Sequence, residues 1–492
     1  MFKISPPSFN LQSLVFWVKK ATPLLVILAL AIFLRTYNIL NTTSIMGDTG
    51  RDLLVAKHLA NFSAPFSARP ATTNSFLSNS PLYFLIIGFL WFLAPSIEGM
   101  IILFAIIQSL VVLVAYALGK KIENKTAGYY LAFYTAINPI FVEASRWVWQ
   151  MHLLILFIPL LVFVFFNLIS VKSLNKASLK LAIFFVVSNI LIHLHYSTFI
   201  LVILMFIWVL IKSFKTKQKR LIIFTIMVIS FSFRLSFSFN LNYLIKNYSQ
   251  ASLITTNAQQ IVSNINIATQ ALFNINDFWL SDIYQSLLIG SLILIFLFFY
   301  LSFFKESASY QSFNKYTSTL IILSISGFLY IFYGGYFFPF LILFHLQIPL
   351  AIFYICKSGK EFKNIGIILG LLLVFLYLQS VKIKLIYWPG KEIALLEDIS
   401  QKISLDVSKN NNSKHFSINL INEVYELTDS DSTFNSALWL FLEEKLQKEL
   451  VVISNSQPTV VEPENFNTLY QVTINENNED EKYTIEKFYI EQ

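Results

Sequence analysis

The sequence has a single cysteine, Cys356, and only 14 glycines among its 492 residues. A single cysteine excludes a disulfide within the chain and argues against a metal site made of thiolates. The glycines are thinly spread, and none of them forms a phosphate-binding loop. Heptads, repeats of about 20–50 residues and clusters of His and Cys are also missing from the sequence. The apolar runs and the few charges between them therefore carry most of the information.

Charged residues are scarce as well. They make up 13% of the chain, whereas hydrophobic residues make up 56% and the mean hydropathy is +0.63. Soluble proteins carry about 25% charged residues. The apolar residues come in repeated runs of about 20, the length that crosses a bilayer, so the sequence predicts a polytopic membrane protein. Lys19 and Lys20 precede the first run, but no small-residue cleavage site follows it, and we expect a retained first helix.

The charges divide the chain into two parts. Residues 381–492 hold 10 Lys and Arg against 19 Asp and Glu, whereas residues 1–380 hold 26 against 9. Because the basic part is also the apolar part, membrane lipids account for the high pI and nucleic acid is not needed as a partner. We expect a membrane domain over residues 1–380 and an acidic, soluble domain over residues 381–492.

The lysines between the apolar runs predict about eleven spans, with the N-terminus inside and the C-terminus outside. Turns such as "GKKIENK" and "KSFKTKQKR" follow the even-numbered spans and share one side, which marks that side as cytoplasmic. The spans are expected near residues 21–40, 97–119, 126–143, 152–170, 178–194, 197–213, 220–240, 284–304, 317–336, 337–356 and 364–380. The predicted fold class is a mainly α-helical transmembrane bundle in the cell membrane.

The outer face then receives the first loop (41–96) and the tail. In the loop, "GRDLLVAKHLA" has helical apolar spacing and "PLYFLIIGFLWFLAP" is short for a span, so both are expected to be interfacial helices. The tail alternates helical with strand-like stretches, which predicts a small α/β domain. Its helices are expected at 392–407 and 433–450, and its strands at 415–421, 467–474 and 483–490.

Asp48 stands on a short turn, "GDTG", just outside the first span. A carboxylate there suits a general base toward an acceptor hydroxyl, or a ligand of a divalent cation. Asp is also a favoured capping residue, so the alternative is an N-cap for the helix that begins near Arg51. Arg51 and Asp52 can pair with each other or with neighbours. We keep Arg51 as a substrate-binding candidate and Asp52 as a candidate second acid.

The segment "EASRWVWQMH" gathers Glu143, Arg146 and His152 between the third and fourth spans. One interpretation is an aromatic belt with an arginine that extends to the interface. The other is a site in which Arg146 and His152 bind a lipid-linked phosphate, since a guanidinium group suits a phosphate better than an ammonium group does. The tryptophans would then contact its sugar or isoprenoid chain.

Five further side chains are candidates for contact with the donor or substrate. His193, His195 and Tyr196 share the outer turn "HLHYS", although a histidine on an apolar face is usually packed in the core. Arg234 lies in the outer half of the seventh predicted span, where it needs an anionic partner such as a donor phosphate. Tyr83 begins the second interfacial helix. Two histidines without a third ligand are weak evidence for a metal, so a metal requirement stays open.

These motifs occur in an order found in one class of enzymes. With "GDTGRD", "SPLYFLIIGFLWFLAP", "SRWVWQMHLL" and "HLHYS", the sequence resembles the polytopic glycosyltransferases of the GT-C class. The most similar group is the family 39-like branch, related to protein O-mannosyltransferases and the lipid A aminoarabinose transferase. The resemblance runs from about Arg35 to His195 and more loosely over residues 333–344. It implies inverting transfer of a sugar from a polyprenyl-phosphate donor to an unidentified glycan, lipid or protein acceptor at the outer face.

The resemblance also implies roles for individual residues. Asp48 corresponds to the base or metal-proximal acid of these enzymes, and Glu143 to a second acid. Arg146, His152, His195 and Arg234 would lie near the donor phosphate. The chain also departs from the pattern: Thr49 follows Asp48 where many relatives have an acid, and "NSPLY" replaces a Lys-Pro-Pro, which removes a phosphate-binding lysine.

Three other functions are compatible with a polytopic chain. A transporter or flippase is the main alternative, but no acid is expected in the middle of a span and no inverted repeat is visible. A lipid-carrier polymerase or ligase would share outer Arg and His clusters while using different motifs. A membrane scaffold whose tail binds a partner would not depend on Asp48.

Overall fold

The structure is a computed structural model, and it describes residues 11–45, 48–67, 80–170, 174–195, 198–215, 338–357, 360–386, 392–409, 416–422, 432–446, 450, 452–453, 460–461, 468–474 and 483–489. The predicted spans at 220–240, 284–304 and 317–336 lie outside these residues. Two candidate site residues, Tyr196 and Arg234, lie outside them as well.

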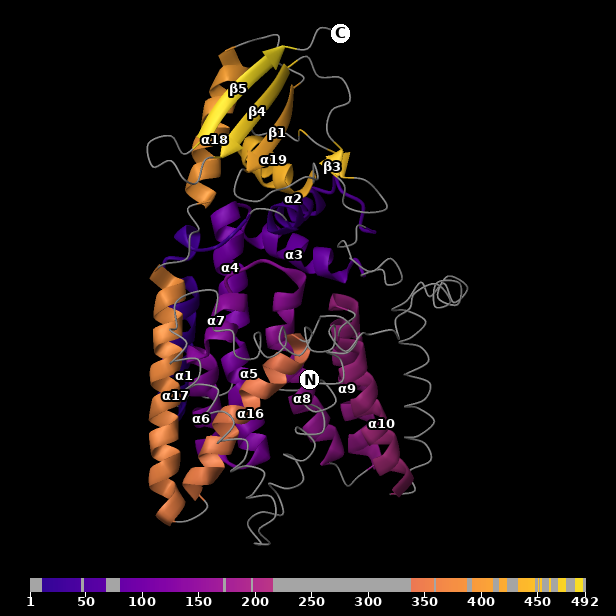
Figure 1. The fold of residues 1–492 in the computed structure, drawn as a ribbon. Helices are drawn as coiled ribbons and strands as arrows, with labels where there is room; N and C mark the ends of the chain where they lie inside the picture. The colour runs from indigo at the N-terminus through magenta and orange to yellow at the C-terminus, as the bar shows by residue number, and fades with distance from the viewer. Residues whose placement is uncertain are drawn as a thin grey trace, which may run out of the picture.

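Helices dominate the described residues (Figure 1). The elements of the membrane part are α1 (Leu11–Thr36), η1 (Ile39–Asn41), α2 (Asp48–Ala60), α3 (Leu82–Leu93), α4 (Ile97–Ser109), α5 (Val111–Ile122), α6 (Lys125–Ile137), α7 (Pro139–Ala144), η2 (Gln150–Leu153), α8 (Leu154–Ile169), α9 (Leu174–Leu194), α10 (Phe199–Lys215), α16 (Phe338–Lys357) and α17 (Lys360–Ile386). The elements of the tail are α18 (Glu392–Lys409), β1 (Phe416–Asn422), α19 (Ser432–Leu446), β2 (Val452–Ile453), β3 (Val460–Val461), β4 (Thr468–Ile474) and β5 (Tyr483–Tyr489).

The described part includes four helical stretches that are long and apolar enough to cross a bilayer. They are Ala21–Asn41, Ile97–Ile122, Gln150–Ile169 and Lys363–Lys382. The last stretch, in α17, leaves Ile368 and Leu371 largely exposed, as suits a helix that faces lipid. The expectation of a membrane protein is thereby supported. The number of eleven spans and the orientation of the chain stay predictions.

The predicted span at 126–143 is interrupted in the structure. Helix α6 ends at Ile137 and α7 begins at Pro139, because proline has no N–H and its ring excludes the preceding helical turn. The side chain of Asn138 caps α7 by accepting hydrogen bonds from the backbone N–H groups of Ile140 and Phe141, at 3.0 and 3.2 Å. The break leaves carbonyl groups without helical partners, and within a bilayer no water would be available to bind them.

Arg35 of α1 binds these carbonyl groups. Its guanidinium is fully buried and donates to the carbonyl oxygens of Ala136 and Thr135, at 3.0 and 3.2 Å. Its Nε donates to the hydroxyl of Ser145 at 3.0 Å. A residue that begins the region of family resemblance thus has a clear structural role, joining the first helix to the broken one.

Helices α2 and α3 lie between the bundle and the tail (Figure 1). They occupy the two stretches for which interfacial helices are expected, and they pack against each other. Gly88 of α3 faces the Cβ of Leu59 on α2, where an added Cβ would lie 3.1 Å away. Helix α2 also contacts α19, so the loop helices form a layer on which the tail rests.

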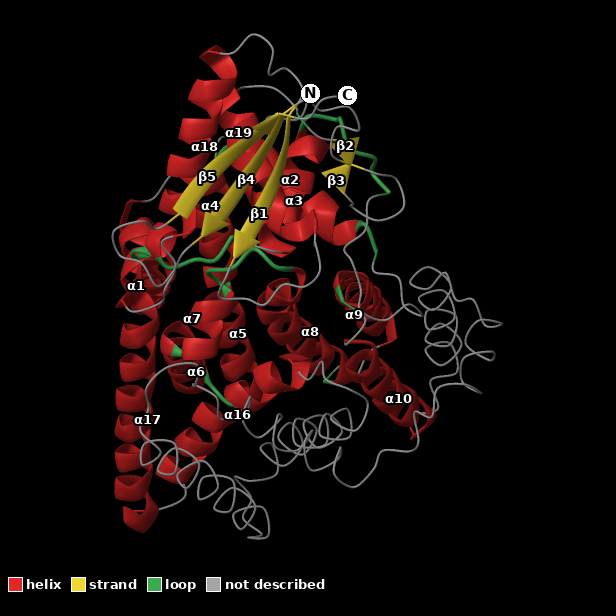
Figure 2. Cartoon of the chain, turned by 45° about the horizontal axis from the view of Figure 1, so that its top comes forward, coloured by secondary structure: helices red, strands yellow, loops and turns green. Residues whose placement is uncertain are grey.

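The tail contains the helices and strands that its sequence pattern predicts, within a few residues at each end. Its larger sheet has the order β1-β4-β5, in which β1 runs parallel and β5 antiparallel to β4 (Figure 2). Strands β2 and β3 form a short antiparallel pair that the sequence did not predict. Helix α19 is buried over Ala437–Leu442 on every side, because α2, α18 and β1 all contact it. Whether the tail is an independent domain stays a prediction.

The pair of helices α5 and α6 provides a test of this packing. At Gly128 an added Cβ would lie 2.7 Å from the backbone oxygen of Tyr116, so Gly128→Ala must separate the helices. Alanine favours a helix by about 1 kcal/mol over glycine, but overpacking costs about 1–3 kcal/mol. We expect a net loss of stability, measured as a lower thermal unfolding midpoint in detergent. An unchanged or higher midpoint would contradict the close approach of these helices.

Candidate active site

Asp48, Arg51 and Asp52 form an ionic cluster in the first turns of α2. Nη1 of Arg51 lies 2.6 Å from Oδ1 of Asp48, and Nη2 and Nε of Arg51 lie 2.7 and 3.0 Å from Oδ1 of Asp52. A spacing of three residues places Arg51 beside Asp48 on the helix surface, and the same guanidinium also reaches the adjacent Asp52. Asp48 is the first residue of α2, where the helix dipole favours a negative charge. The three residues predicted from "GDTGRD" therefore lie together.

The two acids of the cluster have different environments. The Asp48 side chain is 54% exposed, whereas that of Asp52 is 1% exposed. Burial raises the pKa of Asp52 to about 6, and the charge and hydrogen bonds of Arg51 only partly offset that rise. Among the described residues, no hydrogen bond reaches Oδ2 of Asp52. Asp48 is therefore the carboxylate that an incoming molecule can reach.

Tyr83 connects this cluster with the segment that follows α7. It is fully buried on α3, where the Asp52 and Arg51 charges act on its hydroxyl. The hydroxyl lies 3.4 Å from the carbonyl oxygen of Val148, to which it donates. Tyr83, a substrate-binding candidate from the sequence, thus lies between the acidic cluster and the segment that holds Arg146 and His152.

Arg146 binds the carbonyl end of α1. Its Nη1 donates to the carbonyl oxygens of Tyr37, Arg35 and Leu34, at 2.9, 3.2 and 3.3 Å, and its Nη2 donates to the Thr42 hydroxyl. A cation at a helix C-terminus is favourable, and these carbonyls have no helical partner. Burial lowers the pKa of Arg146 to about 10, so it stays charged at neutral pH. Its role toward a donor phosphate stays a prediction.

The other candidates of this segment are packed among aromatic rings. His152 is buried in η2, with its Nδ1 3.1 Å from the carbonyl oxygen of Trp147. The ring of His152 lies 5.2 Å from that of Trp149, centroid to centroid. Glu143 is partly buried in α7, where its backbone carbonyl accepts the N–H of Arg146 at 2.8 Å. Both the aromatic-belt interpretation and the phosphate interpretation place these residues here.

His193 and His195 lie at the end of α9, which contacts both η2 and α3. His195 is buried, and its backbone N–H donates to Leu191 at 3.0 Å. His193 is half-buried, and within the described residues its Nδ1 has no hydrogen-bond partner. The two histidines therefore border the same end of the bundle as Tyr83 and His152.

The described residues contain no group of three His, Cys, Asp or Glu side chains that would hold a metal ion. Asp48 and Asp52 are the two carboxylates of the cluster, and Arg51 forms an ion pair with each of them. Its positive charge takes the place that a cation would have between two carboxylates. In this form the cluster is held together by an arginine and not by a divalent ion.

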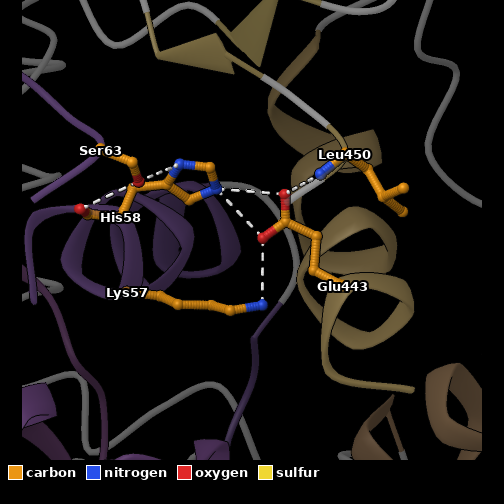
Figure 3. A network of polar contacts seen from close by, with 5 residues as sticks. All are labelled: Lys57, His58, Ser63, Glu443 and Leu450. Atoms are coloured by element: carbon orange, nitrogen blue, oxygen red, sulfur yellow. Dashed lines mark hydrogen bonds and ion pairs between the residues drawn. The ribbon is translucent and has the colours of Figure 1, made fainter. Parts of the chain in front are cut away.

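The sequence did not single out Arg35, His58 or Glu443 as functional. For Arg35 the sequence does offer a signal, because an arginine at the predicted outer end of the first span departs from the predicted cytoplasmic bias of Lys and Arg. His58 and Glu443 bind each other across 385 residues of sequence (Figure 3). No local pattern predicts such a pair.

No known protein family and no curated protein matches this sequence. Solved structures of polytopic glycosyltransferases of the GT-C class nevertheless share its fold. ArnT from Cupriavidus metallidurans bound to undecaprenyl phosphate aligns with a TM-score of 0.54 and 11% identity, over 92% of this chain and 93% of that one. Apo ArnT aligns over the same shares with a TM-score of 0.52.

The Archaeoglobus fulgidus oligosaccharyltransferase, in complex with Zn and sulfate, is similar too, with a TM-score of 0.50 and 13% identity. The alignment covers 85% of this chain and 61% of the oligosaccharyltransferase, so the chain spans about three fifths of that protein's length. At these identities the similarity shows the fold alone. The GT-C resemblance drawn from the sequence motifs is confirmed at that level.

The pH dependence of stability tests the burial of Asp52. Because its folded-state pKa is raised to about 6, Asp52 favours folding fully below about pH 4, and this contribution is lost as the pH rises through about 6. Asp52→Asn should therefore gain stability relative to the wild type between pH 4 and 7, by at most about 3 kcal/mol. Unfolding midpoints over this range measure the difference.

A suitable control is Asp398→Asn on α18. The Tyr483 hydroxyl holds the pKa of this exposed carboxyl below its usual value, so its effect has the opposite sign. If the unfolding midpoints of the wild type and Asp52→Asn change with pH in parallel, folding does not raise the pKa of Asp52, and its burial is contradicted.

Arg146 provides a second test. Arg146→Lys leaves one ammonium group for several separate acceptors, and each buried carbonyl without a donor costs about 1–3 kcal/mol. We expect Arg146→Lys and Arg146→Ala to lower the unfolding midpoint in the absence of any donor. If Arg146→Ala instead unfolds like the wild type and loses only stabilisation by a lipid-linked donor, the phosphate role is correct and the capping role is minor.

Proposed function

We propose that this protein is a membrane glycosyltransferase that moves a sugar from a polyprenyl-phosphate donor to an acceptor at the outer face of the cell membrane. The observation that carries the proposal is the position of Asp48. It is the exposed carboxylate of a cluster held by Arg51, at the end of a helical bundle with the GT-C fold. The undecaprenyl phosphate bound to ArnT supports a lipid-linked donor.

The chemistry assigned to this site is a direct displacement. The acceptor hydroxyl gives its proton to Asp48 while its oxygen bonds to the anomeric carbon, and the bond from that carbon to the donor phosphate oxygen breaks. The lipid phosphate leaves with the bonding electrons. Arg51 and buried Asp52 keep the Asp48 carboxylate in one orientation throughout.

The donor phosphate needs a positive or hydrogen-bonding partner on the opposite side of the sugar. His152, His193 and His195 border this end of the bundle. Two nitrogens of Arg146 donate to acceptor groups of the chain between Leu34 and Thr42. We therefore assign the histidines, with Tyr196 and Arg234 from the sequence, to donor contact. Arg146 is assigned to holding the site in shape.

Replacing Asp48 tests the proposal. Wild type and Asp48→Asn are purified and offered undecaprenyl-phosphate-linked sugars, with thermal stabilisation as the binding measurement and release of undecaprenyl phosphate as the turnover measurement. We expect one sugar to stabilise both proteins, and turnover to fall about 100-fold or more in Asp48→Asn, the usual contribution of a general base.

Glu123→Gln is the matched control, because Glu123 pairs with the half-exposed Lys357 outside the site. It should keep wild-type turnover. Wild-type turnover in Asp48→Asn would refute the role of the base. A folded protein that no donor stabilises would favour a transporter or scaffold instead.

A further inference from the structure

Glu443 of α19 binds the far end of the helix that carries Asp48. Its carboxylate side chain is fully buried and contacts two basic residues of α2 (Figure 3). Oε2 lies 3.0 Å from Nζ of Lys57 and 3.0 Å from Nε2 of His58, and Oε1 accepts the backbone N–H of Leu450 at 2.7 Å. Nδ1 of His58 lies 3.1 Å from the Ser63 hydroxyl, which fixes the ring from its other side.

The buried carboxylate is well compensated. Burial opposes ionisation of Glu443, but the hydrogen bond and charge of His58 and the charge of Lys57 outweigh it, and its pKa lies below the usual value. Removing one partner from a buried, hydrogen-bonded charge is much more costly than breaking an exposed ion pair. The contact therefore holds α2 and α19 together more firmly than a surface salt bridge would.

A second contact joins the same two helices two turns earlier. An added Cβ on Gly50 would lie 2.6 Å from the Cβ of Ala437, so the backbones of α2 and α19 touch at this point. Gly50 precedes Lys57 on α2, and their contact partners on α19, Ala437 and Glu443, occur in the same order. The two helices therefore run parallel along this interface. The interface begins within one turn of Arg51 and ends at His58.

Helix α2 thus has the ionic cluster at one end and the Glu443 contact at the other. A helix of 13 residues is a rigid rod about 20 Å long, so fixing one end and one side fixes the other end. We propose that Glu443 is a positioning residue, which acts through Lys57 and His58 to set α2, and with it Asp48, against the bundle. The tail then belongs to the catalytic unit. This inference rests on the proposed role of Asp48.

The test uses the full-length protein in lipid nanodiscs, with Glu443→Gln compared to Glu397→Gln. Glu397 accepts a bond of 2.9 Å from Lys445 within the same tail, but both side chains are partly exposed, so its loss should have no effect. Hydrogen exchange of the α2 amides, 48–60, is measured without substrate. We expect exchange at least about 10-fold faster in Glu443→Gln and unchanged in Glu397→Gln.

The second measurement is the turnover of the sugar donor that stabilises the wild type in the Asp48→Asn experiment. Displacing Asp48 by about 1 Å should lower kcat about 10- to 100-fold in Glu443→Gln while the KM for the donor stays within about 3-fold, because the donor binds to the bundle. Glu443→Asp, which keeps the charge, should recover part of the loss. Lys57→Met removes one partner only and serves as the milder variant if Glu443→Gln does not fold.

The outcomes separate the two proposals. Unchanged exchange in α2 overturns the positioning role whatever the activity is. Faster exchange with an unchanged kcat overturns it too, since α2 would then be loosened without effect on the reaction. If the wild type itself transfers no sugar, the proposed function fails, and the exchange measurement alone still decides whether Glu443 fixes α2.

Discussion

The need to bind every backbone carbonyl within the bilayer determines the shape of this protein around its site. Pro139 breaks the third predicted span, and the carbonyls it frees are bound by Arg35. The end of α1 frees further carbonyls, which Arg146 binds. Each guanidinium offers several donors in a plane, which an ammonium group cannot match. Two buried arginines therefore determine where the chain leaves the bundle and turns toward α2.

The same turn places two carboxylates in contrasting surroundings. Thr43 donates to the carbonyl oxygen of Arg146 at 2.7 Å, so the chain is tied down a few residues before α2 begins. Asp48 is then at the exposed end of the helix and Asp52 one turn deeper, against Tyr83. Arg51 thus pairs with one exposed and one buried acid. The exposed acid is available to a substrate, and the buried one balances the charge of Arg51.

Much of this architecture is predictable because it follows from local periodicity. The apolar runs locate α4 with α5, α8 and α17, and the alternation in the tail locates β1, β4 and β5 almost to the residue. The motif "GDTGRD" gives the ionic cluster, since its members lie within one or two helical turns. The sequence does not show what a charge contacts over a long separation. The carbonyl partners of Arg146 near Tyr37 lie more than 100 residues away in the sequence, and Glu443 lies 386 residues from Lys57.

The proposed lipid-linked donor would explain why such distant residues matter together. The phosphate of a polyprenyl chain stays at the membrane surface, so the acceptor must meet it there, between the bundle and whatever lies above it. In this protein α2 and α3 form a layer between the bundle and α19. A layer of two short helices between the bundle and the tail is fixed in position by contacts with both of them. Tyr83 and the Arg146 segment hold it from below, and Glu443 holds it from above, which makes the placement of Asp48 a property of the whole chain.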